Sequence, residues 1–181
     1  MLAVAITPEI GITNTRLNTT VAVLTQVLSD EHVLYVKLRN YHWNVTGAHF
    51  AELHGLFAEQ FGILASHIDS VAERIRALGA HTPGTMTEYL QRTALREQTG
   101  KVRAANEMLR NLLGDHESII RFIRESLELP AGSALDLGSS DLLTCVMRDH
   151  EKMAWMLRAI LTDSTCCDHP EKPVPYSVLY E

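Results

Sequence analysis

The chain has 181 residues, of which 46% are hydrophobic and 21% are charged, with ten Gly and six Pro. This length and composition fit one globular domain and exclude a chain that is mainly disordered or collagen-like. Sixteen Lys and Arg against 22 Asp and Glu give a formal net charge of −6, which argues against a surface adapted throughout to neutralising phosphates.

The first predicted element is a long helix that follows an irregular lead-in. Apolar residues recur at helical spacing from Val21 to Leu38, and the pattern fades at Asn44. Gly47 supplies a left-handed end, and a second apolar pattern begins at once and continues to Gly79. The two segments therefore predict a helical hairpin.

The middle of the chain predicts a short helix and then a third long one. A turn-forming cluster at residues 79–84 precedes a short amphipathic segment between Met86 and Leu95. Helical periodicity then continues over residues 102–127 and ends before Pro130.

A fourth long helix completes the pattern, and Ser140–Asp141 is its expected N-cap. The sequence thus predicts an all-α fold, an antiparallel four-helix bundle over residues 18–163 with one longer middle connection. We expect a flexible tail at residues 1–17 and an extended, proline-containing tail at residues 164–181.

The cysteines and the N-terminus bear on the compartment. Cys145, Cys166 and Cys167 are an odd number, and two are adjacent, so they form a poor disulfide framework. The apolar N-terminal residues lack a basic flank and are interrupted by Pro8, so they fall short of a signal peptide. No apolar run approaches the length of a membrane span, and we expect a cytoplasmic protein.

Four residues of the first two helices have side chains that could hold a metal ion. His42 lies near the end of the first helix and His54 early on the second, whereas Asp69 and Glu73 share one helix face further along. Imidazole mixed with carboxylate suits Fe(II) and other first-row divalent ions. Each residue alone also has an ordinary explanation, as a hydrogen-bonded bundle histidine or a solvated acidic pair.

Helix length excludes a site made by one chain. His54 and Asp69 are fifteen residues apart, which is about 22 Å at a rise of about 1.5 Å per residue. If two copies of the second helix pack antiparallel about a two-fold axis, His54 of one copy faces Asp69 and Glu73 of the other. The site would then be shared between two chains.

Small residues lie between the candidate ligands on the same sector of the helix. Ala58, Gly62 and Ala65 would let two such helices approach closely. The alternative is that these residues face a neighbouring helix of their own bundle.

The residues around these ligands resemble the Dps family of mini-ferritins. The resemblance is carried by Tyr41–Gly47 (YHWNVTG), Leu53-His54, Asp69–Ile75 (DSVAERI) and His150–Arg158 (HEKMAWMLR), and it extends over residues 18–162. It implies a ferritin-like subunit with a short extra helix in the middle connection and a hollow homododecamer. It also implies a ferroxidase that oxidises Fe(II), preferably with hydrogen peroxide or else with oxygen, stores ferric oxyhydroxide and protects against oxidative damage.

The same resemblance implies the ligands of a ferroxidase centre at the two-fold interface. These are His42 and His54 from one subunit and Asp69 and Glu73 from its partner, with iron as the metal and Zn as another ion that could occupy the site. Trp43 lies beside the centre, where it could donate an electron or simply fill space.

The sequence departs from the family at one ligand position. The family commonly has an acidic residue four positions after the second histidine, where this chain has Ala58. The loss weakens one iron position, which Glu59, His67 or water could complete.

One further acidic residue receives a role by resemblance. Asp141 matches a position that lines a three-fold iron-entry pore in related proteins, and the N-cap role explains it equally well.

Neither tail carries the basic cluster with which many relatives bind DNA. Arg16 is the sole basic residue before Lys37, and Lys172 is the sole one in the stretch from Thr162. We therefore predict weak or absent DNA binding.

The C-terminal tail holds one more set of metal-binding residue types. Cys166, Cys167 and His169 could bind a soft metal or sense oxidants, but they form an incomplete site, and a plain mobile tail is the alternative.

Iron oxidation and storage in the cytoplasm is thus the leading prediction, with association to the nucleoid left open. The alternatives are a DNA-compacting cage and a metal-buffering cage with weak oxidase activity.

Overall fold

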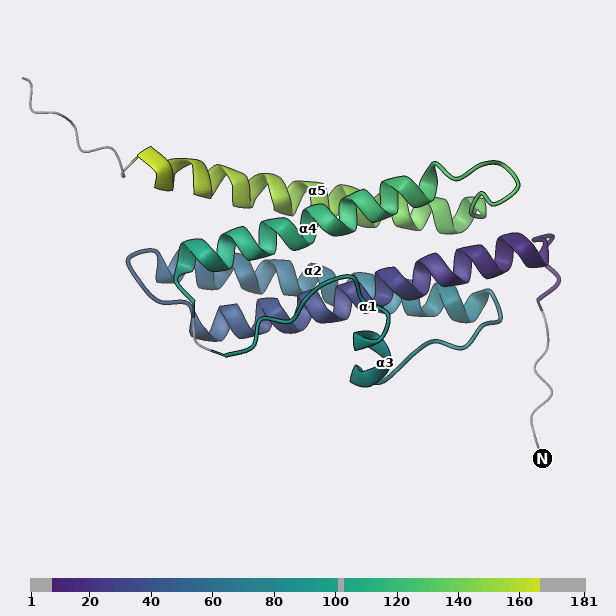
Figure 1. The fold of residues 1–181 in the computed structure, drawn as a ribbon, viewed down its shortest axis with the longest axis horizontal. Coiled ribbons are helices and arrows are strands. Elements are labelled where there is room, and N and C mark those ends of the chain that lie inside the picture. Colours follow the sequence, from purple (N-terminus) through teal and green to yellow (C-terminus); the bar gives the residue numbers. More distant parts are fainter. Residues whose placement is uncertain (1–7, 101–102, 167–181) are drawn as a thin grey trace, which may run out of the picture.

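The computed structural model describes residues 8–100 and 103–166, the last four without their side chains. Its regular elements are all α-helices (Figure 1), namely α1 (Asn14–Asn44), α2 (Phe50–Ala77), α3 (Met86–Leu90), α4 (Ala105–Leu127) and α5 (Leu137–Cys166). The predicted all-α bundle with a short helix in the middle connection is confirmed.

The four long helices form two antiparallel hairpins packed against each other. α1 pairs with α2, and α4 pairs with α5, while α1 also contacts α4 and α2 contacts α5. The long connection after α2 carries the chain back along the bundle, so α2 and α4 run in the same direction (Figure 1). α3 lies on this connection, against the outer side of α1.

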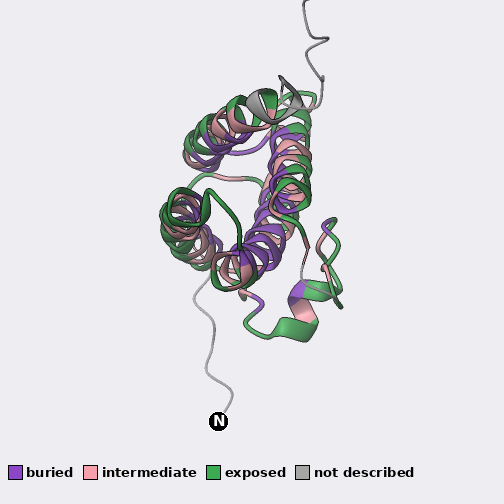
Figure 2. Cartoon of the chain, turned by 90° about the vertical axis from the view of Figure 1, so that its left-hand side faces the viewer, coloured by how far each residue is buried: buried purple, intermediate pink, exposed green. Residues whose placement is uncertain are grey.

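The core follows the apolar periodicity of the sequence. Buried residues lie on the inner faces of the long helices, and exposed residues lie on the outer faces (Figure 2). Phe57, Leu34, Leu112 and Leu157 are completely buried, one from each long helix. Burial of one such side chain is worth about 1.5–3 kcal/mol.

α1 begins at Asn14, four residues before the expected start of the bundle at residue 18. Thr13 caps it by accepting a hydrogen bond from the amide of Arg16. The Arg16 side chain donates to the carbonyls of Ala134 and Leu135 in the loop before α5. These contacts between distant segments fix the first helical turn, which apolar periodicity alone does not indicate.

Two predicted glycine turns are confirmed. Gly47 and Gly79 have φ of +117° and +83°, which side chains other than glycine rarely adopt. A Cβ at Gly79 would also lie 2.6 Å from the Cδ of Pro8, so the segment before α1 lies directly against this turn.

The predicted N-cap of the fourth helix is wrong by one turn. Asp136 caps α5, since its carboxylate accepts from the amide of Ser139 at 3.1 Å. Asp141 lies inside the helix, exposed to solvent. Tertiary structure determines the position of the cap, because Arg74 of α2 donates to the same Asp136 carboxylate.

Polar contacts hold the middle connection against α1. The ring of Tyr89 in α3 stacks on His32 with centroids 3.8 Å apart, and Asp30 accepts from Thr93 and from the amide of Ala94. Further along, Lys37 forms an ion pair with Asp115 of α4.

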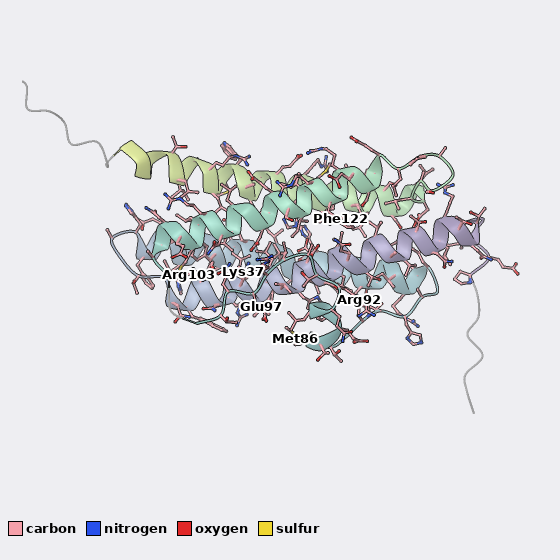
Figure 3. All side chains as sticks on the ribbon, in the orientation of Figure 1. Lys37, Met86, Arg92, Glu97, Arg103 and Phe122 are labelled. Atoms are coloured by element: carbon pink, nitrogen blue, oxygen red, sulfur yellow. The ribbon has the colours of Figure 1, made fainter. Side chains whose placement is uncertain are left out.

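Lys37 and Glu97 also line one surface pocket between α1 and the connection (Figure 3).

Within the described part of the chain, every helix is too short or too polar to span a lipid bilayer.

Candidate metal centre

The two predicted histidines meet at the turn between α1 and α2. His42 lies in the last turn of α1 and His54 in the second turn of α2. Their rings stack with centroids 3.6 Å apart and an interplanar angle of 21°. Each Nδ1 lies 2.8 Å from the backbone carbonyl oxygen of the other residue.

These reciprocal hydrogen bonds determine which ring nitrogens can bind a metal. A carbonyl oxygen only accepts, so Nδ1 must be the donor in both His42 and His54. In the neutral ring the lone pair is then on Nε2, the atom that a metal ion would contact. The hairpin therefore fixes two imidazoles in the tautomer that a metal site needs.

Aromatic side chains surround the pair. Phe61 meets the His42 ring edge-on at 5.3 Å, and Phe50 lies 5.1 Å from the His54 ring. Trp43 is 63% exposed, and the Arg39 guanidinium lies 5.0 Å from its ring centroid. The indole is thus a surface group in the last turn of α1, one residue after His42, and contributes little to the core of its own chain.

The two predicted acids are on the same helix but distant from the histidines. Asp69 and Glu73 are exposed, and neither forms an ion pair with any side chain in the described ranges. Fifteen residues of continuous α2 separate His54 from Asp69, which corresponds to about 22 Å. The four residues therefore do not converge within one chain.

The surface of α2 between these groups is open and built of small residues. Gly62 and Ala65 are exposed, and Ala58 is half-buried. A Cβ at Gly62 would meet no atom within 4 Å. The seam Ala58–Gly62–Ala65 thus lies largely outside the packing of its own bundle.

The two auxiliary ligand candidates face different surroundings. Glu59 is exposed on α2. His67 is buried instead, with Nε2 3.0 Å from Asp149 of α5 and Nδ1 3.7 Å from Glu31 of α1. The structure thus directs His67 into the bundle, because it occupies the apolar stripe of α2, and it is not available on the surface beside Asp69.

The other predicted groups lie away from this turn. Asp141 is on the exposed face of α5 near its start. Cys145 is an exposed free thiol. The set of Cys166, Cys167 and His169 falls outside the described side chains.

A second cluster of polar side chains, which we call the bundle cluster, lies in the interior. It comprises Glu31, His67, His116 and His150, one from each long helix, and all four are buried. His150 Nε2 lies 2.6 Å from Glu31 Oε1, and His150 Nδ1 lies 2.8 Å from His116 Nδ1.

Burial dominates the electrostatics of this cluster. Desolvation alone would raise the pKa of Glu31, but the imidazoles of His150 and His67 outweigh it and lower that pKa to about 2. Desolvation and the neighbouring His150 hold the pKa of His116 well below its usual value. Glu31 is therefore a buried anion and His116 a neutral imidazole near pH 7.

Sequence analysis missed the bundle cluster, although a signal for it exists. Each member interrupts an apolar stripe at a spacing of three or four residues. The apolar neighbours on these stripes are Val27, Leu34, Leu64, Val71, Leu112, Ile119, Val146 and Met153. A polar residue at a core position in all four helices is uncommon enough to mark a site.

Known proteins are similar to this chain in sequence and in fold. A family model for the ferritin-like domain matches residues 21–166. A low temperature-induced protein of Nostoc sp. is 40% identical over 153 residues, which are 84% of this chain and 86% of that protein. The DNA protection during starvation protein 2 of Bacillus anthracis is 37% identical over 78% of this chain and 95% of its own length.

Solved structures agree with these relatives. The Dps protein from Vibrio cholerae O1, a ferritin-like diiron-carboxylate protein, superposes with a TM-score of 0.79 at 34% identity, over 89% of this chain and 99% of that one. DpsC from Streptomyces coelicolor gives a TM-score of 0.80 at 28% identity, over 90% of this chain and 91% of its own.

Proposed function

Because the chain belongs to the Dps family of ferritin-like proteins, we propose that it oxidises Fe(II) at centres shared by two subunits and stores the ferric product inside a hollow homododecamer. Iron is the substrate and the cargo of this reaction. Hydrogen peroxide is the proposed oxidant, and oxygen is a slower one.

The observation that carries the proposal is the reciprocal hydrogen bonding of His42 and His54. Here both Nδ1 atoms donate to carbonyls, and neither Nε2 forms a hydrogen bond with the described part of the chain. Two neutral nitrogen donors on adjacent rings suit Fe(II).

We assign the missing anionic ligands to Asp69 and Glu73 of a neighbouring subunit. The support is the open seam of small residues on α2, which allows two copies of this helix to approach closely. Carboxylate oxygens are hard ligands that favour Fe(III) over Fe(II), so they would draw the reaction toward its product.

The stoichiometry explains why paired irons would protect the cell. Two Fe(II) ions give two electrons to one hydrogen peroxide molecule, which takes up two protons and leaves as two water molecules. A single Fe(II) ion would give one electron and release hydroxyl radical. We assign to Trp43, which follows His42 in the sequence and is exposed, the role of electron donor when only one iron is bound; the alternative is that it only fills space.

Complementation between two inactive variants tests the shared centre. His42→Ala/His54→Ala and Asp69→Ala/Glu73→Ala should each oxidise Fe(II) with peroxide at less than about a tenth of the wild-type rate in stopped-flow absorbance. Reassembling equal amounts of the two from dissociated subunits should restore about a quarter of the centres, because only mixed dimers hold one complete site.

The outcome distinguishes a shared centre from a site within one chain. Recovery of rate on co-assembly, with none when either variant is reassembled alone, supports the proposal. Full activity of the histidine variant, or no recovery in mixed assemblies of verified composition, contradicts it.

Ala58 favours one second candidate, a cage that buffers metal with weak oxidase activity. A methyl group cannot bind iron, so the centre has one ligand fewer than the family commonly has. Comparing equilibrium Fe(II) binding with the single-turnover oxidation rate separates the two functions. Tight binding with a negligible rate would identify the buffer.

A further inference from the structure

The bundle cluster is chemically distinct from the surface centre. Its potential donor atoms come from one chain, namely Glu31 of α1, His67 of α2 and His150 of α5. One ligand atom from each lies within 4.8 Å of the other two. No partner subunit is needed to bring them together.

Two potential ligand atoms of the cluster lack hydrogen-bond partners. Glu31 Oε2 and His67 Nδ1 are buried without any hydrogen-bond partner. Asp149 accepts from His67 Nε2, so in the neutral ring Nδ1 carries the lone pair. That nitrogen lies 3.7 Å from Glu31 Oε1, too far for a good hydrogen bond. A cation bound between them, either a proton on Nδ1 or a metal ion in its place, would satisfy both atoms.

The third potential ligand, His150, is oriented by Glu31 and His116. His150 Nε2 is 2.6 Å from Glu31 Oε1, the distance expected when a proton lies between them. The other nitrogen of the ring is 2.8 Å from Nδ1 of the buried His116, which fixes the orientation of the imidazole. In the doubly protonated ring, a metal ion would displace the Nε2 proton into solvent and leave a neutral imidazole whose remaining proton, on Nδ1, is donated to His116 Nδ1.

We propose that this cluster binds one first-row divalent transition-metal ion through the Glu31 carboxylate, His67 Nδ1 and His150 Nε2. Asp149 and His116 are positioning residues, since metal-binding histidines commonly use the second ring nitrogen to bond a carboxylate or another acceptor. Two imidazoles and one carboxylate form a ligand set suited to Fe(II) or Zn(II).

The required movement is small. Ligand atoms about 2.0–2.1 Å from a tetrahedral ion lie about 3.3 Å apart. The two separations from Glu31 Oε1, 2.6 and 3.7 Å, bracket that value. Since the ligands come from α1, α2 and α5, the ion would tie the two hairpins together and raise the unfolding temperature.

Crystals grown with Co(II) test the site in the unaltered protein. The expected result is an anomalous difference peak between Glu31, His67 and His150 in every subunit. Peaks confined to the surface centre at His42 and His54 would overturn this inference and leave the proposed function intact. A peak in the bundle cluster without one at the surface would support this inference and contradict the proposed centre.

A solution titration provides an independent measurement. In the His42→Ala/His54→Ala background, where the surface centre is disabled, Co(II) should still give visible absorption bands and raise the unfolding temperature. Adding Asp149→Ala should weaken Co(II) binding about 10- to 100-fold, and adding Glu31→Gln should abolish it.

The variants differ usefully in their risk of misfolding. The Asp149 side chain is 51% exposed, so its removal should leave the core intact. If Glu31→Gln does not fold, the Co(II) affinity of the Asp149→Ala variant still tests the proposed site. The matched control is Glu125→Ala, an exposed acid on α4, which should leave Co(II) affinity unchanged. Absence of binding in the histidine-deleted background, or equal affinity with and without Asp149, would overturn the inference.

Discussion

Ala58 stands where the resemblance to the Dps family implies an acidic ligand. It lies one helical turn after His54 and is half-buried on the seam that we assign to the subunit interface. An acidic side chain there would point to the same region as the His54 ring, since residues four apart share a helix face. The methyl group leaves that region without an anionic ligand.

Replacing Ala58 by Asp should therefore complete the centre. We expect Ala58→Asp to raise the number of Fe(II) ions bound per centre from about one to about two and to speed peroxide-dependent oxidation. Anaerobic Fe(II) titration and stopped-flow absorbance measure the two effects. Ala131→Asp, an exposed position in the loop after α4, is the matched control and should change neither. Unaltered iron binding in Ala58→Asp would show that position 58 does not face the metal.

At the level of the element, the start of α5 shows how a helix end depends on distant contacts. The Asp136 carboxylate accepts from the Ser139 amide and from Arg74 of α2, and Arg74 also donates to the Ser139 hydroxyl. Desolvation opposes ionisation, but the hydrogen bonds from Ser139 and the charge of Arg74 outweigh it and lower the pKa of Asp136 below its usual value near 3.8.

The direction of this shift fixes how stability depends on pH. Because the pKa of Asp136 is lower in the folded state, the ionised carboxylate adds to the free energy of unfolding. This contribution is fully present above the unfolded pKa, about pH 4, and is lost as the pH falls through the folded pKa. Asp136→Asn keeps a capping side chain and removes the charge. We expect it to cost about 1 kcal/mol at pH 7 and progressively less below about pH 4, by urea denaturation. Asp141→Asn, an exposed site in the same helix, should have no effect. A deficit that is constant with pH would contradict the charge-based explanation.

The seam of small residues on α2 offers a test of the proposed contact between two helices. Gly62 presents bare backbone to the surface, so a large side chain there would keep two α2 helices apart without disturbing its own bundle. Gly62→Leu should abolish the assembly and the ferroxidase activity together while leaving the helical circular dichroism unchanged. Light scattering during size-exclusion chromatography measures the assembly, and Glu125→Leu on α4 is the control. An intact, active cage would place the subunit contact elsewhere.

For the whole molecule, charge limits the choice of partner. The net charge of −6 and the absence of a basic cluster from either tail of the sequence both disfavour binding to a polyanion. We predict no gel shift of duplex DNA at about 0.15 M salt, where surface charges are screened beyond about 8 Å. Retarded complexes that persist at higher salt would contradict this prediction and favour the DNA-compacting alternative.

Periodicity along the chain was enough to predict four long helices, because each helix must place one apolar face toward the others. Gly47 and Gly79 were also recognisable, since few residues other than glycine adopt their backbone angles. His42 and His54 flank the tight turn of the predicted hairpin, and the resemblance to the Dps family already assigned both to one subunit. These features are local, and the physical forces behind them act within a few residues.

Tertiary structure decided the rest. Asp136 rather than Asp141 caps α5 because Arg74 approaches from another helix. His67 points into the bundle, where Glu31, His116 and His150 join it from three other helices. Periodicity predicts that such positions belong to the core, but it cannot show that the four polar side chains lie at the same level of the bundle. Only the packing of the helices brings them together, and burial then strengthens the electrostatic interactions among them.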